Sequence, residues 1–290
     1  MTARPPSARQ APITRFAPSP TGRLHLGHAW SALLAHDRAR MVGGRFLLRI
    51  EDIDGGRCRT EHVDGILDDL RWLGLVWDGA PIVQSSRAAA HAAGLGRLIA
   101  SGLAYRCVCT RADIVASAGA PQGEGHARYP GTCRHVPVAA DDPRPACWRL
   151  DMAAACSRAG PLEWVDEAAG RVAATPELFG DIVVARKDAG TSYHLAATLD
   201  DAADGVTHVV RGRDLFRATH VHRLLQALLG LPVPTYRHHA LVVGPDGRRL
   251  AKRTPGATLA DLRDAGVDPV RVVADLRAGR LPVGFAFDGA

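Results

Sequence analysis

Strand-like and helix-like segments alternate near the start of the chain, and this alternation restricts the fold more than any other feature. Residues 13–16 are predicted to form a short strand, and residues 28–41 carry apolar side chains at helical spacing. Residues 45–50, RFLLRI, form a nearly continuous apolar run, typical of a strand buried on both faces. A second helix is predicted from Thr60, as its capping residue, to Gly74. This order of elements predicts an α/β fold with a parallel sheet.

The rest of the chain shows this alternation of strands and helices only in part. A third helix is predicted at about residues 86–101, strand-like alternation returns at 180–196 and 205–212, and a further helix is predicted at 219–229. The Gly- and Pro-rich stretch between these parts predicts an insertion. We therefore divide the chain into a disordered tail (1–14), a first half of the sheet domain (15–102), the insertion (103–180), the second half (181–244) and a C-terminal region with short helices (245–290).

Composition narrows the class of protein. The 290 residues are 47% hydrophobic, enough for one large domain or two modest ones. No apolar run reaches the roughly 20 residues that span a bilayer, and the start lacks the apolar core of a secretory signal, so we expect a cytoplasmic protein without a membrane partner. The net charge of +6 suits RNA as a partner, although abundant arginine is equally typical of a GC-rich genome.

The stretch PSPTGRLHLGH, residues 18–28, places His25 and His28 three positions apart. Such a pair can ligate a metal, cap a helix or contact a nucleotide. Its place favours the nucleotide, because the start of the first helix after the first strand is where such sheets bind phosphates. Gly27 leaves room for a base or ribose to approach the backbone.

Three of the six cysteines are spaced as possible metal ligands. Cys107 and Cys109 form a Cys-x-Cys pair, which is weak evidence alone, and Cys133 follows in the Gly-rich stretch. His126 and His135 flank that stretch and are chemically suited to complete a zinc site. The other three cysteines have no partner at ligand spacing, so we interpret them as ordinary thiols: Cys58, Cys147 and Cys156.

Several motifs, taken together and in order, resemble one family. RFAPSPTGRLHLGH, from Arg15 on, is similar to the signature of class I aminoacyl-tRNA synthetases of the glutamyl type. LRIEDID then supplies Glu51, VTHVVRGRD supplies Arg211, and Tyr193 precedes that strand as the family requires. RRLAKR stands where the family has its lysine loop. The resemblance covers residues 15–253 and implies a Rossmann-like catalytic domain with a zinc-binding insertion.

The resemblance also implies roles for single residues. It assigns catalysis to His25, His28 and Lys252, which together with Gly27 would bind ATP, and Mg²⁺ would accompany the ATP. The remaining matched positions would bind L-glutamate: Arg15, Phe16, Ala17, Pro18, Ser19, Glu51, Tyr193 and Arg211. An arginine fork suits a carboxylate, and a carboxylate suits the ammonium group. Arg249 and Ala251 depart from the family's usual lysine and serine.

Two further expectations follow from the resemblance. Tyr129 stands four residues before Cys133, where the family has a fourth zinc ligand, so Cys107, Cys109, Tyr129 and Cys133 are expected to hold one structural Zn²⁺. About forty residues follow the lysine loop, which leaves no room for an anticodon-binding domain. In this the chain resembles the glutamyl-queuosine tRNA(Asp) synthetases, which attach glutamate to the queuosine base of tRNA(Asp); we expect a monomer.

Three alternatives stay open from the sequence. A truncated glutamyl-tRNA synthetase would charge the 3′ end of a tRNA instead. The altered lysine loop also fits an RNA-binding relative that has lost catalysis. Cytidylyl- and adenylyltransferases share the H-x-G-H pattern, but their chains are commonly shorter and lack the RFAPS stretch.

Overall fold

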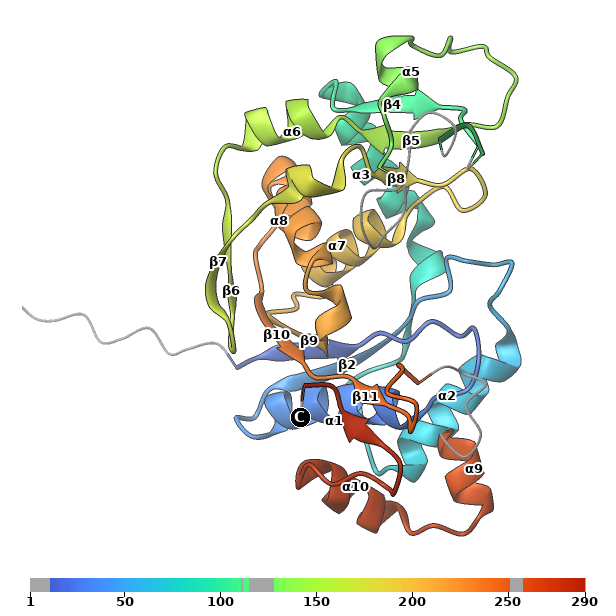
Figure 1. The fold of residues 1–290 in the computed structure, drawn as a ribbon, viewed down its shortest axis with the longest axis vertical. Coiled ribbons are helices and arrows are strands. Elements are labelled where there is room, and N and C mark those ends of the chain that lie inside the picture. The colour runs from blue at the N-terminus through green and yellow to red at the C-terminus, as the bar shows by residue number, and fades with distance from the viewer. Residues whose placement is uncertain (1–10, 111, 115–127, 251–257, 290) are drawn as a thin grey trace, which may run out of the picture.

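A computed structural model describes residues 11–110, 112–114, 128–250 and 258–289. Two groups of parallel strands form its central layer (Figure 1). The first consists of β1 (Ile13–Phe16), β2 (Arg45–Ile50) and β3 (Ile82–Val83), in the order β1–β2–β3. The second contains β9 (His208–Gly212), β10 (Thr235–His239) and β6 (Glu163–Asp166), with β7 (Gly170–Ala173) antiparallel at its edge.

The two groups of strands meet at β1 and β9. The backbone N–H of Thr207, just before β9, donates to the carbonyl of Ile13 at 2.9 Å. From β1 the strand order runs to one side through β2 and β3. From β9, next to β1, it runs to the other side through β10 and β6. This reversal next to β1 is the topological switch point at which parallel α/β sheets bind their ligands.

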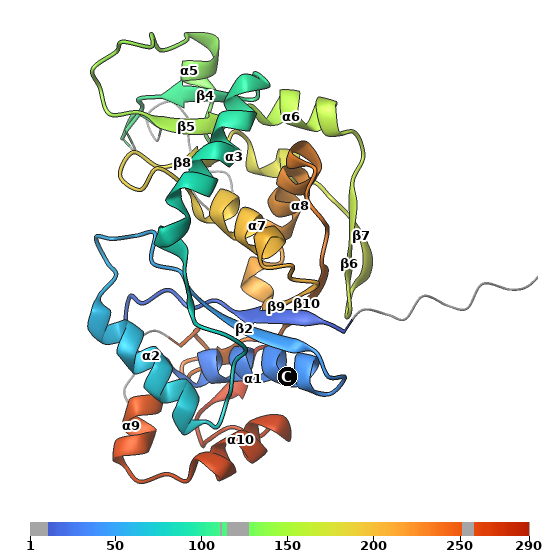
Figure 2. The same ribbon diagram turned by 180° about the vertical axis from the view of Figure 1, so that it is seen from behind.

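Helices cover both faces of the central layer. Helix α1 (Leu26–Arg40) buries Leu26, Ala29, Ala32 and Leu33 in the same apolar core as β1 and β2. In Figure 1 it lies below the strands, whereas α7 (Tyr193–Ala203) and α8 (Ala218–Leu229) lie above them. Seen from behind, α2 (Thr60–Trp72) lies beside the C-terminal helices α9 (Leu259–Asp264) and α10 (Pro269–Arg277) (Figure 2).

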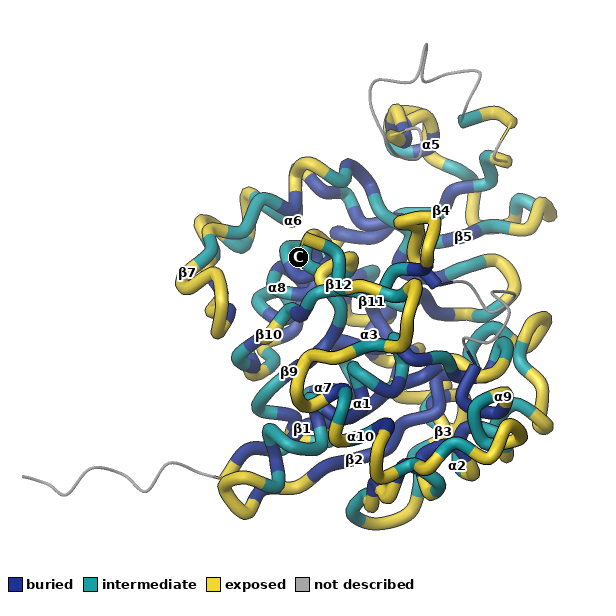
Figure 3. The backbone as a smooth tube through the Cα atoms, turned by 60° about the horizontal axis from the view of Figure 1, so that its bottom comes forward, coloured by how far each residue is buried: buried dark blue, intermediate teal, exposed yellow. Residues whose placement is uncertain are grey.

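A separate antiparallel sheet stands at one end of the molecule. It contains β4 (Ala104–Cys107), β5 (Cys147–Leu150) and β8 (Val183–Ala185). Four helical elements lie around it: α3 (Ala88–Ala100), α5 (Thr132–His135), α6 (Met152–Ala159) and η2 (Pro176–Phe179). The short helix η1 (Gln84–Arg87) leads into α3. Near the C-terminus β11 (Val242–Val243) pairs with β12 (Ala286–Phe287), and η3 (Arg213–Leu215) follows β9. Figure 3 shows the buried residues gathered toward the middle of the molecule.

Three local predictions were wrong. The tail expected to be disordered through Thr14 ends earlier, because Ile13 and Thr14 belong to β1. Thr60 is the first residue of α2 rather than its cap, and the N-cap residue is Arg59, which makes no side-chain capping bond. The strand-like alternation predicted through residue 196 ends at Ala185 in β8, and Tyr193 begins a helix. The cause is a local helix-start signal, because the Ser192 hydroxyl accepts from the backbone N–H of Leu195. Among the described residues, no helix is both long and apolar enough to cross a membrane.

Candidate active site

A cavity of about 470 Å³ opens at the carboxyl ends of β1 and β9. Its lining comes from the loop after β1, the start of α1, the ends of β2 and β9, and the segment after β10. Every glutamate- and ATP-binding residue predicted from the sequence lies here, except one that falls outside the described residues. The predicted residues in the lining are Arg15, Phe16, Ala17, Pro18, Ser19, His25, Gly27, His28, Glu51, Tyr193 and Arg211. Lys252 lies outside the described residues, although its neighbours Arg249 and Leu250 line the cavity.

His25 and His28 cap the start of α1. Nδ1 of His25 accepts from the backbone N–H of Gly27 at 3.1 Å, and Nδ1 of His28 accepts from that of His25 at 3.2 Å. The two rings lie 3.8 Å apart between centroids. A Cβ on Gly27 would stand 3.0 Å from the His25 ring, so a side chain there would disturb the cap. Capping therefore fixes both imidazoles in the wall of the cavity, which confirms the helix cap, whereas contact with a nucleotide stays a prediction.

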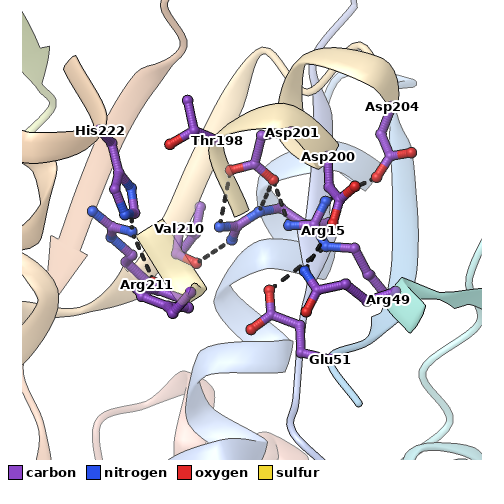
Figure 4. Close-up of polar contacts among 12 residues, drawn as sticks. Arg15, Arg49, Glu51, Thr198, Asp200, Asp201, Asp204, Val210, Arg211 and His222 are labelled. Atoms are coloured by element: carbon purple, nitrogen blue, oxygen red, sulfur yellow. Dashed lines mark hydrogen bonds and ion pairs between the residues drawn. The ribbon is translucent and has the colours of Figure 1, made fainter. Parts of the chain in front are cut away.

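Arg15 is paired with a carboxylate below the cavity. Its Nε donates to Oδ1 of Asp201 at 2.9 Å, and its Nη2 donates to Oδ2 at 3.3 Å (Figure 4). Arg49 donates to the same Oδ1 at 2.6 Å. Burial raises the pKa of Asp201, but the two arginines outweigh it and lower that pKa to about 2. The positive charge of Arg15 is thus compensated within the protein.

The pairing of Arg15 extends into a chain of buried ions. Arg49 also reaches Asp204 at 2.8 Å, and Arg87 contacts both Asp204 and Asp200. Asp200 and Asp201 lie on α7 and Asp204 follows as its C-cap residue, whereas Arg15 and Arg49 lie on β1 and β2. The network therefore fixes the helix that begins with Tyr193 against the strands that carry Arg15. Sequence reasoning missed it; the available signal was a run of acids in an otherwise apolar helix.

Arg211 is buried without any such carboxylate. Its exposed fraction is 5%, and no Asp or Glu among the described residues lies within ion-pair distance. Its guanidinium donates only to neutral groups, on β10, α8 and η3 as well as to Tyr193. These acceptors are Nε2 of His238 (3.1 Å), the Tyr193 hydroxyl (3.3 Å), Nδ1 of His222 (3.4 Å), the Thr219 hydroxyl (2.6 Å) and the Leu215 carbonyl (3.2 Å). A buried cation in such surroundings favours an anion from outside.

Glu51 brings a negative charge to the same cavity. It is 8% exposed, and its Oε1 lies 3.6 Å from Nε of Arg49. Burial raises its pKa, and the nearby Arg49 and Arg15 oppose that rise. Its backbone N–H donates to the Pro18 carbonyl at 3.0 Å, which joins the loop after β1 to the end of β2. The cavity therefore combines a cation that no carboxylate of the described residues contacts directly with an acid suited to an ammonium group.

Three thiols converge at the far end of the molecule. The sulfur atoms of Cys107, Cys109 and Cys133 lie within 4.8 Å of one another and could hold a metal ion. The Tyr129 hydroxyl lies 3.4 Å from the Cys107 sulfur and 3.6 Å from that of Cys109. The three thiols thus fit a compact metal site, and the phenol of Tyr129 lies beside them.

The other residues weighed for the metal lie differently. His135 is exposed, and its Nε2 lies 3.4 Å from Nη2 of Arg134 instead of facing the thiols. His126 falls outside the described residues. Cys147 faces Cys107 across β4 and β5, and its sulfur donates to the Cys107 carbonyl at 3.4 Å.

Comparison with known families decides what kind of protein this is. Residues 13–279 match the family described as tRNA synthetases class I (E and Q), catalytic domain. The chain belongs to this family. It is therefore a ligase of the class I tRNA synthetase type, as the motifs predicted. The match also confirms the predicted parallel-sheet catalytic domain.

Relatives of this synthetase carry a more specific name. A glutamyl-Q tRNA(Asp) synthetase of Rhodobacter capsulatus is 49% identical over 91% of this chain and 98% of its own length. One from Symbiobacterium thermophilum is 45% identical over 90% of this chain and 84% of its own. Among solved structures, a glutamate-tRNA synthetase of Elizabethkingia anophelis is 26% identical with a TM-score of 0.72. The match covers 89% of this chain and 54% of that one, so the synthetase spans about half of this relative.

Proposed function

We propose that the chain activates L-glutamate with ATP and transfers it to the queuosine base of tRNA(Asp). The observation that carries the first step is the cavity that holds Arg211 and Glu51. The Arg211 guanidinium, which no described carboxylate contacts directly, suits a carboxylate of glutamate, and Glu51 suits its ammonium group. Arg15 adds hydrogen-bond donors to the site, but its positive charge is already balanced by Asp201.

Activation joins the α-carboxylate of glutamate to ATP. A carboxylate oxygen attacks the α-phosphorus, the bond from that phosphorus to the bridging oxygen breaks, and pyrophosphate leaves with Mg²⁺ as part of the substrate. Negative charge grows on the phosphate oxygens in this step. His25 and His28, held at the start of α1, and Lys252 would stabilise that charge, while the cavity orients the reactants.

The second step replaces AMP by an RNA acceptor. The name glutamyl-Q tRNA(Asp) synthetase, carried by the two relatives above, supports our proposal of queuosine in tRNA(Asp) as that acceptor. A relative named glutamate–tRNA ligase, from Oleidesulfovibrio alaskensis, is 37% identical and supports the rival reaction, in which glutamate is joined to a tRNA as in a glutamyl-tRNA synthetase. We further propose that Cys107, Cys109, Tyr129 and Cys133 hold a structural Zn²⁺, which would fix the insertion and supply no chemistry to the reaction.

Two assays test the proposal in sequence. Glutamate-dependent exchange of pyrophosphate into ATP, without tRNA, is expected for the purified chain with Mg²⁺. No exchange would contradict the activation step. Transfer of labelled glutamate is then compared on queuosine-containing tRNA(Asp), queuosine-free tRNA(Asp) and tRNA(Glu). We expect transfer to the first alone, whereas charging of tRNA(Glu) would establish the rival acceptor.

A further inference from the structure

The hydrogen bond at Nε of Arg211 determines the protonation of the ring next to it. Nε lies 3.1 Å from Nε2 of His238. An arginine N–H can only donate, so Nε2 must offer a lone pair. The neutral ring then carries its proton on Nδ1. Burial and the nearby Arg211 lower the pKa of His238 to about 4, which keeps the ring neutral near pH 7.

A carboxylate lies on the other side of the same ring. Nδ1 of His238 lies 2.7 Å from Oδ2 of Asp166, and the two side chains are 2% and 1% exposed. Burial raises the pKa of Asp166, but hydrogen bonds from the Ala169 amide and from His238 outweigh it and lower that pKa. Asp166 is itself fixed, since its Oδ1 accepts from the amides of Ala168 and Ala169 at 2.9 Å each. The Nδ1–H of His238 therefore has a charged acceptor.

We propose that Asp166 and His238 are positioning residues that aim the Arg211 guanidinium at the glutamate-binding cavity. Asp166, at the end of β6, selects the ring form of His238 on β10, and that ring holds Nε of Arg211 on β9. Three neighbouring strands thus contribute one residue each to a single line of hydrogen bonds. The inference rests on the proposed function for its substrate, and its geometry stands on the distances above.

The arrangement gives Arg211 a counter-ion that does not occupy it. A buried guanidinium needs negative charge nearby, but a carboxylate in direct contact would compete with a substrate carboxylate. Asp201 makes that direct contact with Arg15. At Arg211, the imidazole of His238 stands between the guanidinium and the carboxylate of Asp166. Asp166 can therefore stabilise the cation while leaving its charge available to an incoming anion.

Variants of His238 test the positioning role. His238→Gln keeps an acceptor near the place of Nε2, whereas His238→Leu removes it. We expect His238→Leu to raise the KM for glutamate about tenfold, the value of one hydrogen bond to a charged group. The KM for ATP and kcat should stay within about twofold, and His238→Gln should recover most of the loss. His208→Gln, on β9 and outside the cavity lining, is the matched control.

The outcomes separate this inference from the proposed function. If the parent shows no exchange, the proposed function fails. If the parent is active and folded His238→Leu keeps its KM for glutamate, or loses ATP and glutamate binding equally, the positioning role fails.

Nitrogen-15 NMR of the histidine rings provides a test that needs neither activity nor a folded variant. The His238 signal, assigned with the glutamine variant or by sequential assignment of the parent, should report a proton on Nδ1 and none on Nε2 at pH 7. A proton on Nε2 would overturn the inference even in an active enzyme.

Discussion

The two arginines expected to bind glutamate, Arg15 and Arg211, are equivalent in the sequence and different in the fold. Arg15 shares Asp201 with Arg49, whereas Arg211 meets only neutral acceptors among the described residues. A guanidinium that already forms an ion pair has less to gain from a substrate carboxylate than one that does not. At the scale of single residues, Arg211 is therefore the stronger anion receptor of the two.

Substitution of Arg211 tests this difference. Arg211→Gln keeps a polar side chain and removes the charge, so the KM for glutamate should rise roughly 10- to 100-fold, the range for hydrogen bonds to charged groups. The measurement is ATP–pyrophosphate exchange at varied glutamate concentrations. Arg237→Gln, on the exposed side of β10, controls for the loss of a nearby positive charge. Equal effects of the two substitutions would contradict a direct role for Arg211.

Glu51 makes binding depend on pH in a definite direction. Only its ionised form attracts the ammonium group, and burial raises its pKa above the ordinary 4.5. Binding that needs the carboxylate is complete well above this raised pKa and is lost as the pH falls through it. We therefore expect the KM for glutamate to increase on acidification at a higher pH than an exposed glutamate would produce. Initial exchange rates between pH 5 and 8 measure this, with circular dichroism to verify folding.

The Glu51→Gln variant is the internal control for that profile. It should bind glutamate weakly at every pH and lack the acid-side increase in KM, because the glutamine amide does not titrate in this range. An acid-side increase of equal size in the variant would assign the titration to another group.

At the scale of elements, the sequence predicts the segments whose signal is local. Helix α1 and strand β2 occur where periodicity and the apolar run place them. Helix α7 was missed because Tyr193 and the residues before it alternate like a strand, and the capping Ser192 was overlooked. The pairing of Arg15 with Asp201 joins residues 186 positions apart, so no spacing rule reveals it. The motifs predicted which residues line the cavity, but they did not predict which carboxylate pairs with Arg15.

Asp201 should contribute strongly to stability because it connects α7 to β1 and β2. Asp201→Asn removes the negative charge that Arg15 and Arg49 share, while both arginines stay buried. Removing one partner of a buried ion pair costs roughly 3–5 kcal/mol. Its pKa is lowered to about 2, so this contribution is present above pH 4 and is lost as the pH falls through about 2. Urea unfolding at pH 7 measures the change in the free energy of unfolding.

The control for Asp201 is an ion pair at the surface. Asp68 pairs with Arg71 at 3.1 Å on α2, where both side chains are more than half exposed. Asp68→Asn should change the free energy of unfolding by less than about 1 kcal/mol. A similarly small change for Asp201→Asn would mean that the buried network contributes little.

At the scale of the whole molecule, the cavity and the thiol cluster belong to different sheets. No described residue between 103 and 180 lines the cavity, and the three thiols lie on and around the β4–β5 sheet. Contacts of α3 and α7 with that sheet connect it to the catalytic half. A metal at the thiols should therefore support the local fold of the insertion without taking part in activation at the cavity.

Removal of the metal should weaken the fold of the insertion without stopping glutamate activation at the cavity. The purified chain is expected to contain about one zinc atom, because three thiols lie within 4.8 Å of one another and the Tyr129 hydroxyl lies beside them. Cys109→Ser should lose that zinc and melt at a lower temperature, since metal binding contributes to folding. Cys156→Ser, outside the cluster, should retain both the zinc and the melting temperature.

Glutamate-dependent exchange by Cys109→Ser should stay within about twofold, because the cavity is built from the other sheet. Elemental analysis, thermal melting and the exchange assay measure the three effects; less than a tenth of a zinc atom per parent chain, without chelators, would contradict the site. A loss of exchange as large as the loss of zinc would show that the cluster supports the cavity as well.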